Sequence, residues 1–130
     1  MDYDVVIIGA GVVGLAVARE LAETSNKTVL IIEKEANFGQ GISSRNSEVI
    51  HSGIYYPPDS LKAKFCTRGR ELTYDFCQKH QIWHEQCGKL VIAQENQLDD
   101  LEQLYNRSIE NSVPDTRIID QNELISLEPQ

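Results

Sequence analysis

Two apolar runs near the start of the chain have the pattern of buried parallel strands. Residues 3–8 and 28–32 are rich in Val and Ile without alternating polar residues, as in strands that are covered on both faces. Between them, residues 15–24 are rich in Ala, Leu, Arg and Glu, which favour a helix. A strand, a helix and a second strand over about 30 residues predict a right-handed βαβ unit.

The pattern that follows is mainly helical, with one long loop. Residues 34–59 have no clear period and contain several Gly and Pro, so we expect a functional loop with short regular pieces. Apolar residues recur near helical spacing over 61–79 and 97–111. Ser60 and Asn96 are the expected N-caps of these two helices.

Three shorter elements are expected toward the end of the chain. Residues 88–93 and 116–119 are predicted as short strands. Asp120 is followed three residues later by Glu123, a variant of the capping box, which predicts a short final helix.

A glycine motif lies between the first strand and the first helix. In Gly9-x-Gly11-x-x-Gly14, the first glycine permits a tight turn, the second lets a pyrophosphate approach, and the third lets the helix pack on the strand. The free N–H groups at the helix start favour phosphate binding. The predicted phosphate-binding residues are Gly9, Ala10, Gly11, Val12, Val13 and Gly14.

An acidic residue ends the second predicted strand. Glu33 stands where a carboxylate accepts hydrogen bonds from the ribose of a bound dinucleotide, and it would repel the 2′-phosphate of NADP. Lys34 follows it and is included among the candidate cofactor-binding residues. The alternative is a plain glycine-rich turn with a solvated glutamate.

The next segment favours FAD over NAD. Residues 41–47 are dense in small donors, which suits a long cofactor that runs past the first helix. The alternative is a polar surface loop. The candidate cofactor-binding residues here are Ser43, Ser44, Arg45, Asn46 and Ser47.

Two stretches together resemble a known family. The chain is similar to FAD-dependent oxidoreductases of the D-amino-acid-oxidase type, and within them to the subgroup that oxidises L-2-hydroxyglutarate. The motif in residues 4–14 is common to many flavoproteins. The motif in residues 43–57 is specific to far fewer proteins, and it favours this subgroup. The resemblance covers essentially the whole chain and includes Ser60-Leu-Lys-Ala63, Gly88-Lys-Leu90, Glu123-Leu124 and Glu128-Pro129.

The resemblance implies a fold and its division. It implies an α/β protein with a partial, doubly wound Rossmann-like FAD-binding domain over residues 1–85. Residues 86–130 would begin an α+β substrate domain. Relatives of this kind are much longer, and their later segments complete the flavin site and carry most substrate contacts. We therefore expect an incomplete active site in this chain alone, with a second chain as one source of the rest.

The resemblance also implies a reaction. A small 2-hydroxy acid, favoured to be L-2-hydroxyglutarate, would be oxidised to its 2-oxo acid by hydride transfer to flavin N5. Residues 43–53 would pass beside the flavin, with His51 and Gly53 nearest the ring. His51 is the candidate catalytic base, since imidazole titrates near working pH. The alternative is a structural histidine that bonds loop backbone.

Two other functions stay open from the sequence. The chain could be another amine- or polyol-oxidising member of the superfamily, such as a glycerol-3-phosphate dehydrogenase-like enzyme. It could also be a truncated, non-catalytic dinucleotide-binding fragment.

Charge and hydropathy limit the classes of partner and the cellular location that we expect. The chain has 12 basic and 20 acidic residues and a net charge of −8, which argues against nucleic-acid binding. No apolar run approaches the about 20 residues of a transmembrane helix. With an acidic start and no basic leader, a cytoplasmic location is predicted, and peripheral contact with the inner membrane or a quinone is left open.

No metal site is predicted. Cys77, His80, His84 and Cys87 are residue types that bind zinc, but the helix is expected to end among them, which would prevent their convergence.

Overall fold

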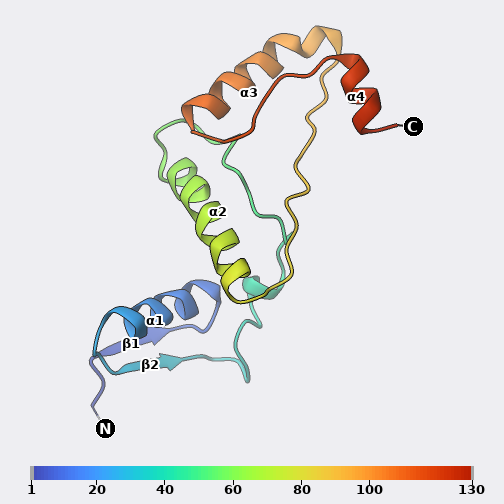
Figure 1. The fold of residues 1–130 in the computed structure, drawn as a ribbon. Coiled ribbons are helices and arrows are strands. Elements are labelled where there is room, and N and C mark those ends of the chain that lie inside the picture. Colours follow the sequence, from blue (N-terminus) through green and yellow to red (C-terminus); the bar gives the residue numbers. More distant parts are fainter. Residues whose placement is uncertain (1, 130) are drawn as a thin grey trace. The chain divides into compact units, whose positions relative to one another are not determined.

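The N-terminal elements form the expected βαβ unit. In this computed structural model, which describes residues 2–129, strand β1 (Val5–Ile8), helix α1 (Val12–Thr24) and strand β2 (Val29–Ile32) follow one another (Figure 1). The strands pair in parallel, with Val5 opposite Val29 and Ile8 opposite Ile32. The α/β fold with a small parallel sheet agrees with a partial Rossmann-like FAD-binding domain, as predicted.

Helix α1 covers only one face of this sheet. Ile7 lies against the helix, because its Cγ2 would be 3.3 Å from a Cβ at Gly14. On the opposite face, Val6 is 51% exposed and Ile8 is 88% exposed. The prediction of strands covered on both faces is therefore wrong for the first unit by itself, since no element among its residues 2–49 forms a second layer there.

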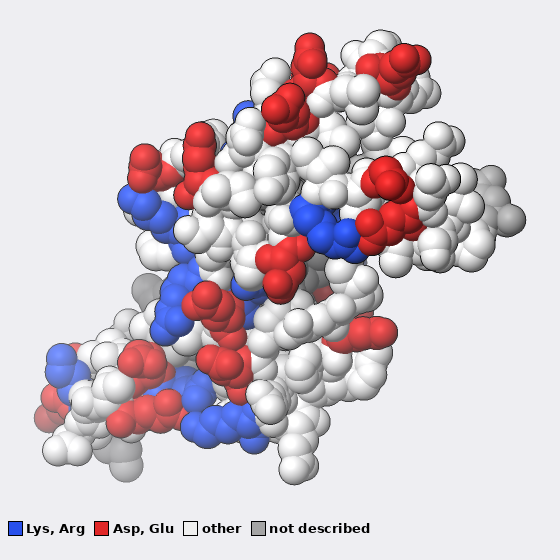
Figure 2. All heavy atoms as spheres, turned by 45° about the horizontal axis from the view of Figure 1, so that its top comes forward, with Lys and Arg blue, Asp and Glu red and all other residues white. Residues whose placement is uncertain are grey.

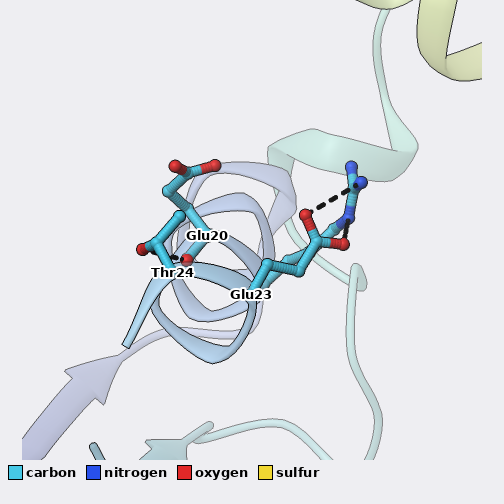
Figure 3. Close-up of polar contacts among 4 residues, drawn as sticks. Glu20, Glu23 and Thr24 are labelled. Atoms are coloured by element: carbon cyan, nitrogen blue, oxygen red, sulfur yellow. Dashed lines mark hydrogen bonds and ion pairs between the residues drawn. The ribbon is translucent and has the colours of Figure 1, made fainter. Parts of the chain in front are cut away.

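The polar side of α1 is held by contacts along the helix. The Arg19 guanidinium bonds the Glu23 carboxylate one turn later, with Nε 2.9 Å from Oε1. Thr24 Oγ1 donates to the Glu20 carbonyl at 2.6 Å, as Figure 3 shows. These exposed contacts each add a few tenths of a kcal/mol, about 0.3–0.5 for the ion pair.

Helix α2 (Leu61–Lys79) spans the predicted residues. It begins where Ser60 Oγ accepts a hydrogen bond of 3.1 Å from the Ala63 N–H. The predicted N-cap is thereby confirmed.

The next helix begins differently from the prediction. A 3₁₀ turn, Glu95–Gln97, precedes helix α3 (Leu98–Glu110). Gln94 and Gln97 form a reciprocal capping box, in which the Gln94 N–H donates to Gln97 Oε1 at 3.1 Å. Asn96 is therefore not the cap, because the reciprocal side-chain to backbone bonds of this turn are made by Gln94 and Gln97.

The last helix, α4 (Gln121–Leu127), follows Asp120 as predicted. Asp120 Oδ1 accepts from the Glu123 N–H at 2.9 Å. The Glu123 carboxylate pairs with Arg117, so the capping box is only half formed.

The two short strands predicted late in the chain are absent. Residues 88–93 and 116–119 form no strand, and the only sheet within residues 2–129 pairs β1 with β2. A strand needs a hydrogen-bonded neighbour, and these segments have none among the described residues.

Contacts divide the chain into two units, Met1–Val49 and Ile50–Gln130. The sequence predicts a boundary after residue 85, which concerns the cofactor and substrate domains of a complete enzyme and stays a prediction. In the second unit the buried residues are Gly53, Ala63, Cys77, Ser108, Asn111 and Val113. Three of these six are polar or glycine, so this unit has a small core.

No helix in residues 2–129 is long and apolar enough to cross a membrane. On the face drawn in Figure 2, carboxylates and cations are interspersed, and no broad region is covered by cations alone.

Candidate functional site

The three glycines form the turn between β1 and α1. Gly9 has a φ of +105°, a conformation that favours glycine, and its N–H donates to the Ile32 carbonyl at 2.7 Å. A Cβ at Gly14 would lie 2.1 Å from the Gly9 carbonyl oxygen. The turn and the first helical turn are therefore in backbone contact, which only glycine at position 14 allows.

The start of α1 meets the loop that follows β2. Gly11 is the N-cap of α1, and the Val12 N–H donates to Ser43 Oγ at 2.9 Å. A Cβ at Gly11 would lie 3.1 Å from the same oxygen. The fold thus brings Ser43, in the 3₁₀ turn Ile42–Ser44, to the glycine turn.

The amides of Val13 and Gly14 lie in the first turn, where a helix has no intrahelical acceptor for its N–H groups. The positive end of the helix dipole adds to their attraction for anions. An open depression of about 400 Å³ lies here. It is lined by Ile7, Ile8, Gly9, Gly11, Val12, Val13, Gly14, Val17 and Ser43.

The Glu33 carboxylate points to the same turn. Its Oε2 accepts from the Ala10 N–H at 2.7 Å, and its Oε1 accepts from the Glu35 N–H at 3.0 Å. The backbone hydrogen bonds from Glu35 and then Ala10 lower the pKa of Glu33 below 4.5. A negative charge therefore stands at the end of β2 at neutral pH.

Lys34 lies next to this carboxylate in sequence but pairs elsewhere. Its Nζ is 3.5 Å from Glu35 Oε1, and the side chain is 87% exposed. The charge of Glu33 is thus not neutralised by an ion pair with Lys34.

The loop after Ser43 is held mainly by its own side chains. Ser44 Oγ donates to the Gly41 carbonyl at 3.0 Å, and Asn46 Nδ2 donates to the Ser43 carbonyl at 2.8 Å. Arg45 and Ser47 are exposed. Of the predicted donors in residues 43–47, only Ser43 contacts the glycine turn.

His51 and Gly53 belong to the second unit. His51 is exposed, whereas Gly53 is buried with a φ of +96°. A Cβ at Gly53 would lie 3.2 Å from Thr67 Oγ1, so the turn contacts α2.

Sequence reasoning missed the residue that holds this turn. Asn111 Nδ2 donates to the carbonyls of Gly53, at 3.0 Å, and Tyr56, at 2.9 Å. The sequence pattern places Asn111 only at the end of a helix. An asparagine at the end of a predicted helix is the local signal, and its partners are more than 50 residues away.

Lysines cover the tyrosines of the same turn. Lys62 Nζ lies 4.4 Å from the Tyr56 ring centre, and Lys89 Nζ lies 4.7 Å from the Tyr55 ring centre. These are cation–π distances. The Lys89 contact links the predicted Gly88-Lys-Leu90 stretch to Tyr55, and the Lys62 contact links α2 to Tyr56.

The residues considered for zinc are engaged separately. His84 Nδ1 lies 2.8 Å from the Ile82 carbonyl, and the His80 ring lies 4.4 Å from the Phe76 ring. Cys77 is buried while Cys87 is exposed. Within the described part of the chain, no three His, Cys, Asp or Glu side chains are grouped to hold a metal ion.

The sequence matches known proteins over its length. A family model described as FAD dependent oxidoreductase matches residues 4–130. L-2-hydroxyglutarate dehydrogenases named as mitochondrial are 50% identical in Dictyostelium discoideum, 50% in Arabidopsis thaliana and 43% in Homo sapiens. Each match covers 98% of this chain and 29%, 26% and 28% of those proteins, respectively.

A solved structure has the same fold over this chain. L-alpha-glycerophosphate oxidase from Mycoplasma pneumoniae, with FAD bound, is 31% identical and has a TM-score of 0.80. The match covers 99% of this chain and 35% of that one. The chain therefore spans about three-tenths of the curated relatives' length.

These names contradict one prediction. The relatives are named as mitochondrial, which contradicts the predicted cytoplasmic location. The prediction from the acidic start was wrong, because the charge of a few N-terminal residues is a weak guide to location.

Proposed function

This chain belongs to the FAD dependent oxidoreductase family, whose model matches residues 4–130, and from that premise we propose that it takes part in oxidising L-2-hydroxyglutarate to 2-oxoglutarate. The predicted family resemblance is confirmed. The observation that carries the proposed substrate is the identity of 43–50% to L-2-hydroxyglutarate dehydrogenases over 98% of the chain.

The first unit fits the adenosine and diphosphate part of FAD. An open depression lies at the start of α1, and the amides of Val13 and Gly14 face no intrahelical acceptor. When bound, FAD would supply the acceptor for the hydride that leaves the substrate carbon. The glycine turn, Ser43 and Glu33 would hold it.

Glu33 can keep its present contacts and still bind a sugar. A carboxylate has about four lone-pair sites, of which the Ala10 and Glu35 N–H groups use two. The Lys34 backbone N–H also interacts with this carboxylate and lowers its pKa, so at least one site remains for a ribose hydroxyl. The same negative charge would repel a 2′-phosphate, which supports FAD or NAD over NADP.

The proposed reaction needs a base that takes the hydroxyl proton. We propose His51 as this base, because an imidazole can take a proton near neutral pH and the resemblance implies that residues 43–53 would pass beside the flavin. The alternative is that His51 is a structural histidine that hydrogen-bonds the loop backbone. Residues 1–85 would serve the cofactor, and residues 86–130 would begin the substrate domain.

The remaining substrate contacts would come from further polypeptide, either contiguous or on a second chain, because this chain spans 26–29% of the relatives' length. Electron transfer to a quinone at a membrane stays part of the proposal. The fold match to a glycerophosphate oxidase, with a TM-score of 0.80, favours oxidation of glycerol 3-phosphate as the second candidate.

The test combines flavin binding with turnover. The chain is expressed with FAD, alone and together with the reading frame that follows it, and its visible spectrum is recorded. Reduction of an artificial dye is then measured with L-2-hydroxyglutarate, its D-enantiomer and glycerol 3-phosphate. We expect a flavin spectrum and turnover of the L-acid only. Turnover of glycerol 3-phosphate alone would support the second candidate, and absence of flavin would support a non-catalytic fragment.

A further inference from the structure

One face of α2 carries an arginine among its covered positions. Ala63, Thr67, Arg70, Tyr74 and Cys77 follow one another at spacings of three and four residues, so they share a face of the helix. All five are buried or half-buried. Arginine is rarely covered in proteins unless it is paired, because a charge taken out of water without a partner costs free energy. The position of Arg70 therefore calls for an anionic partner.

Arg70 has no such partner within residues 2–129. Its Nε is buried and makes no hydrogen bond, and no ion pair of the described chain includes it. None of the residues three or four positions away along α2 is acidic, so the helix itself supplies no partner. The exposed Arg68 differs, because its Nη1 lies 2.9 Å from Glu71 Oε2. In a chain with 20 acidic residues, a covered guanidinium that pairs with none of them indicates a ligand from outside.

Tyr74 places a second donor on the same face. It lies one turn after Arg70 and is half-buried, and none of the described residues bonds its hydroxyl. Its ring centre is 5.8 Å from that of His84, and His84 Nδ1 lies 2.8 Å from the Ile82 carbonyl oxygen. Because a carbonyl only accepts, Nδ1 carries the hydrogen and the imidazole is held in place. The phenol is thus supported by a fixed ring while its hydroxyl stays available.

The donors of these two side chains define the class of ligand. A guanidinium offers N–H groups in a planar fork and has no acceptor, so it binds anions. A carboxylate matches the fork with two oxygens and one charge, whereas a phosphate group brings up to two negative charges to a single positive charge. We propose that Arg70 and Tyr74 form a carboxylate-binding site on α2, where the guanidinium and the phenol both donate to the carboxylate.

Two sources supply this chemistry. One is a free organic acid, and the other is an Asp or Glu side chain of the further polypeptide that the proposed function requires. The donors belong to one helix of the second unit, and the site needs neither flavin nor turnover. Its failure would therefore leave the proposed function untouched, and a chain that binds no flavin would leave the site untouched.

The stability of the chain without added acid tests whether the guanidinium is unpaired. Arg70→Met removes the charge and keeps a long apolar side chain, and Arg68→Met makes the same change at the exposed position that pairs with Glu71. Because only Arg70 leaves a covered donor unsatisfied, we expect a higher urea midpoint for Arg70→Met than for Arg68→Met. An equal or lower midpoint would mean that Arg70 is already engaged and would overturn the proposal.

A titration of the ¹⁵N-labelled wild-type chain tests the first source and needs no variant to fold. We expect glutarate to shift the Nε–H signal of Arg70 in a saturable way and to leave that of Arg68 unchanged. Arg70→Met should weaken glutarate binding about tenfold or more, and Tyr74→Phe about two- to tenfold. An equal response of Arg70 to sulfate at the same ionic strength would overturn the preference for carboxylate.

The same signal tests the second source in the chain expressed with its further polypeptide. With no acid added, a side-chain carboxylate should shift the Arg70 Nε–H, slow its exchange with water and abolish the response to glutarate. A shift in the chain alone assigns the site to a free acid, and a shift only in the larger protein assigns it to a side chain. An Arg70 signal that stays unshifted in both would refute the site.

Discussion

Replacing Gly14 by alanine sets two physical effects against each other. Helix propensity alone favours alanine over glycine by about 1 kcal/mol in a helix interior. The structure opposes this, because the added Cβ would lie 2.1 Å from the Gly9 carbonyl oxygen and 3.2 Å from the Gly9 carbonyl carbon.

The contact with the Gly9 carbonyl decides whether Gly14→Ala stabilises or destabilises the fold. Carbon and oxygen need a separation about 1 Å larger than this, and the neighbour is backbone that forms a turn with a φ of +105°. Forced overpacking costs about 1–3 kcal/mol, and backbone contact places the cost near the upper value. After the gain in propensity, we expect a net loss of about 2 kcal/mol.

Gly69→Ala is the control. Gly69 lies within α2, and a Cβ there would meet no atom within 4 Å. The same change of residue should therefore stabilise α2 by up to about 1 kcal/mol.

Amide exchange resolved along the chain measures both effects, since each variant lies in its own unit. A loss of about 2 kcal/mol corresponds to roughly thirtyfold faster exchange of the β1 and β2 amides in Gly14→Ala. Gly69→Ala should slow exchange in α2. If Gly14→Ala also slowed exchange in its unit, the backbone contact would not constrain this position and the reasoning would be wrong.

Three further predictions concern single side chains. Ser60→Ala should destabilise α2 by about 1 kcal/mol through loss of its N-cap, whereas Ser60→Asp keeps an acceptor; equal urea midpoints for the two variants would contradict the cap. The lowered pKa of Glu33 means that its ionised form stabilises the fold above its ordinary pKa of 4.5, and that this contribution is lost as the pH falls through the lowered pKa. Glu33→Gln should therefore flatten the acid side of the pH–stability curve, and an unchanged curve would refute the assignment. Exposed Cys87 should react with iodoacetamide well before buried Cys77. Mass spectrometry of the peptides measures the two rates of alkylation, and equal rates would contradict the difference in burial.

Local features of the fold could be predicted from the sequence. The βαβ unit, the bounds of α2 and the caps at Ser60 and Asp120 depend on residues within one or two turns of each other. A cap requires only that an oxygen side chain stand before a helical pattern. Such signals can be recognised from a short segment of sequence, because all the residues that produce them lie within it.

Pairing and tertiary contacts could not be predicted in the same way. Residues 88–93 have a strand-like composition, yet a strand forms only with a partner, and none of the described residues supplies one. The Asn111 bonds join residues 55 and 58 positions apart, so no periodicity reveals them. Within the candidate site, the Gly9–Gly14 turn and Glu33 were located because their spacing is fixed by one βαβ unit.

Ser43 shows that the candidate site depends both on local sequence signals and on tertiary contacts. Its sequence context makes it one of several candidate cofactor-binding residues in a segment of small donors, whereas the fold places its Oγ 2.9 Å from the Val12 nitrogen. In that bond the hydroxyl accepts, so its own hydrogen can donate to a phosphate oxygen. The first helical turn would then present the Val13 and Gly14 amides together with one hydroxyl that is already held in place. Because this bond holds the loop at the helix start, less conformational entropy would be lost on binding, and under the proposed function the glycine turn and Ser43 would bind the phosphates together.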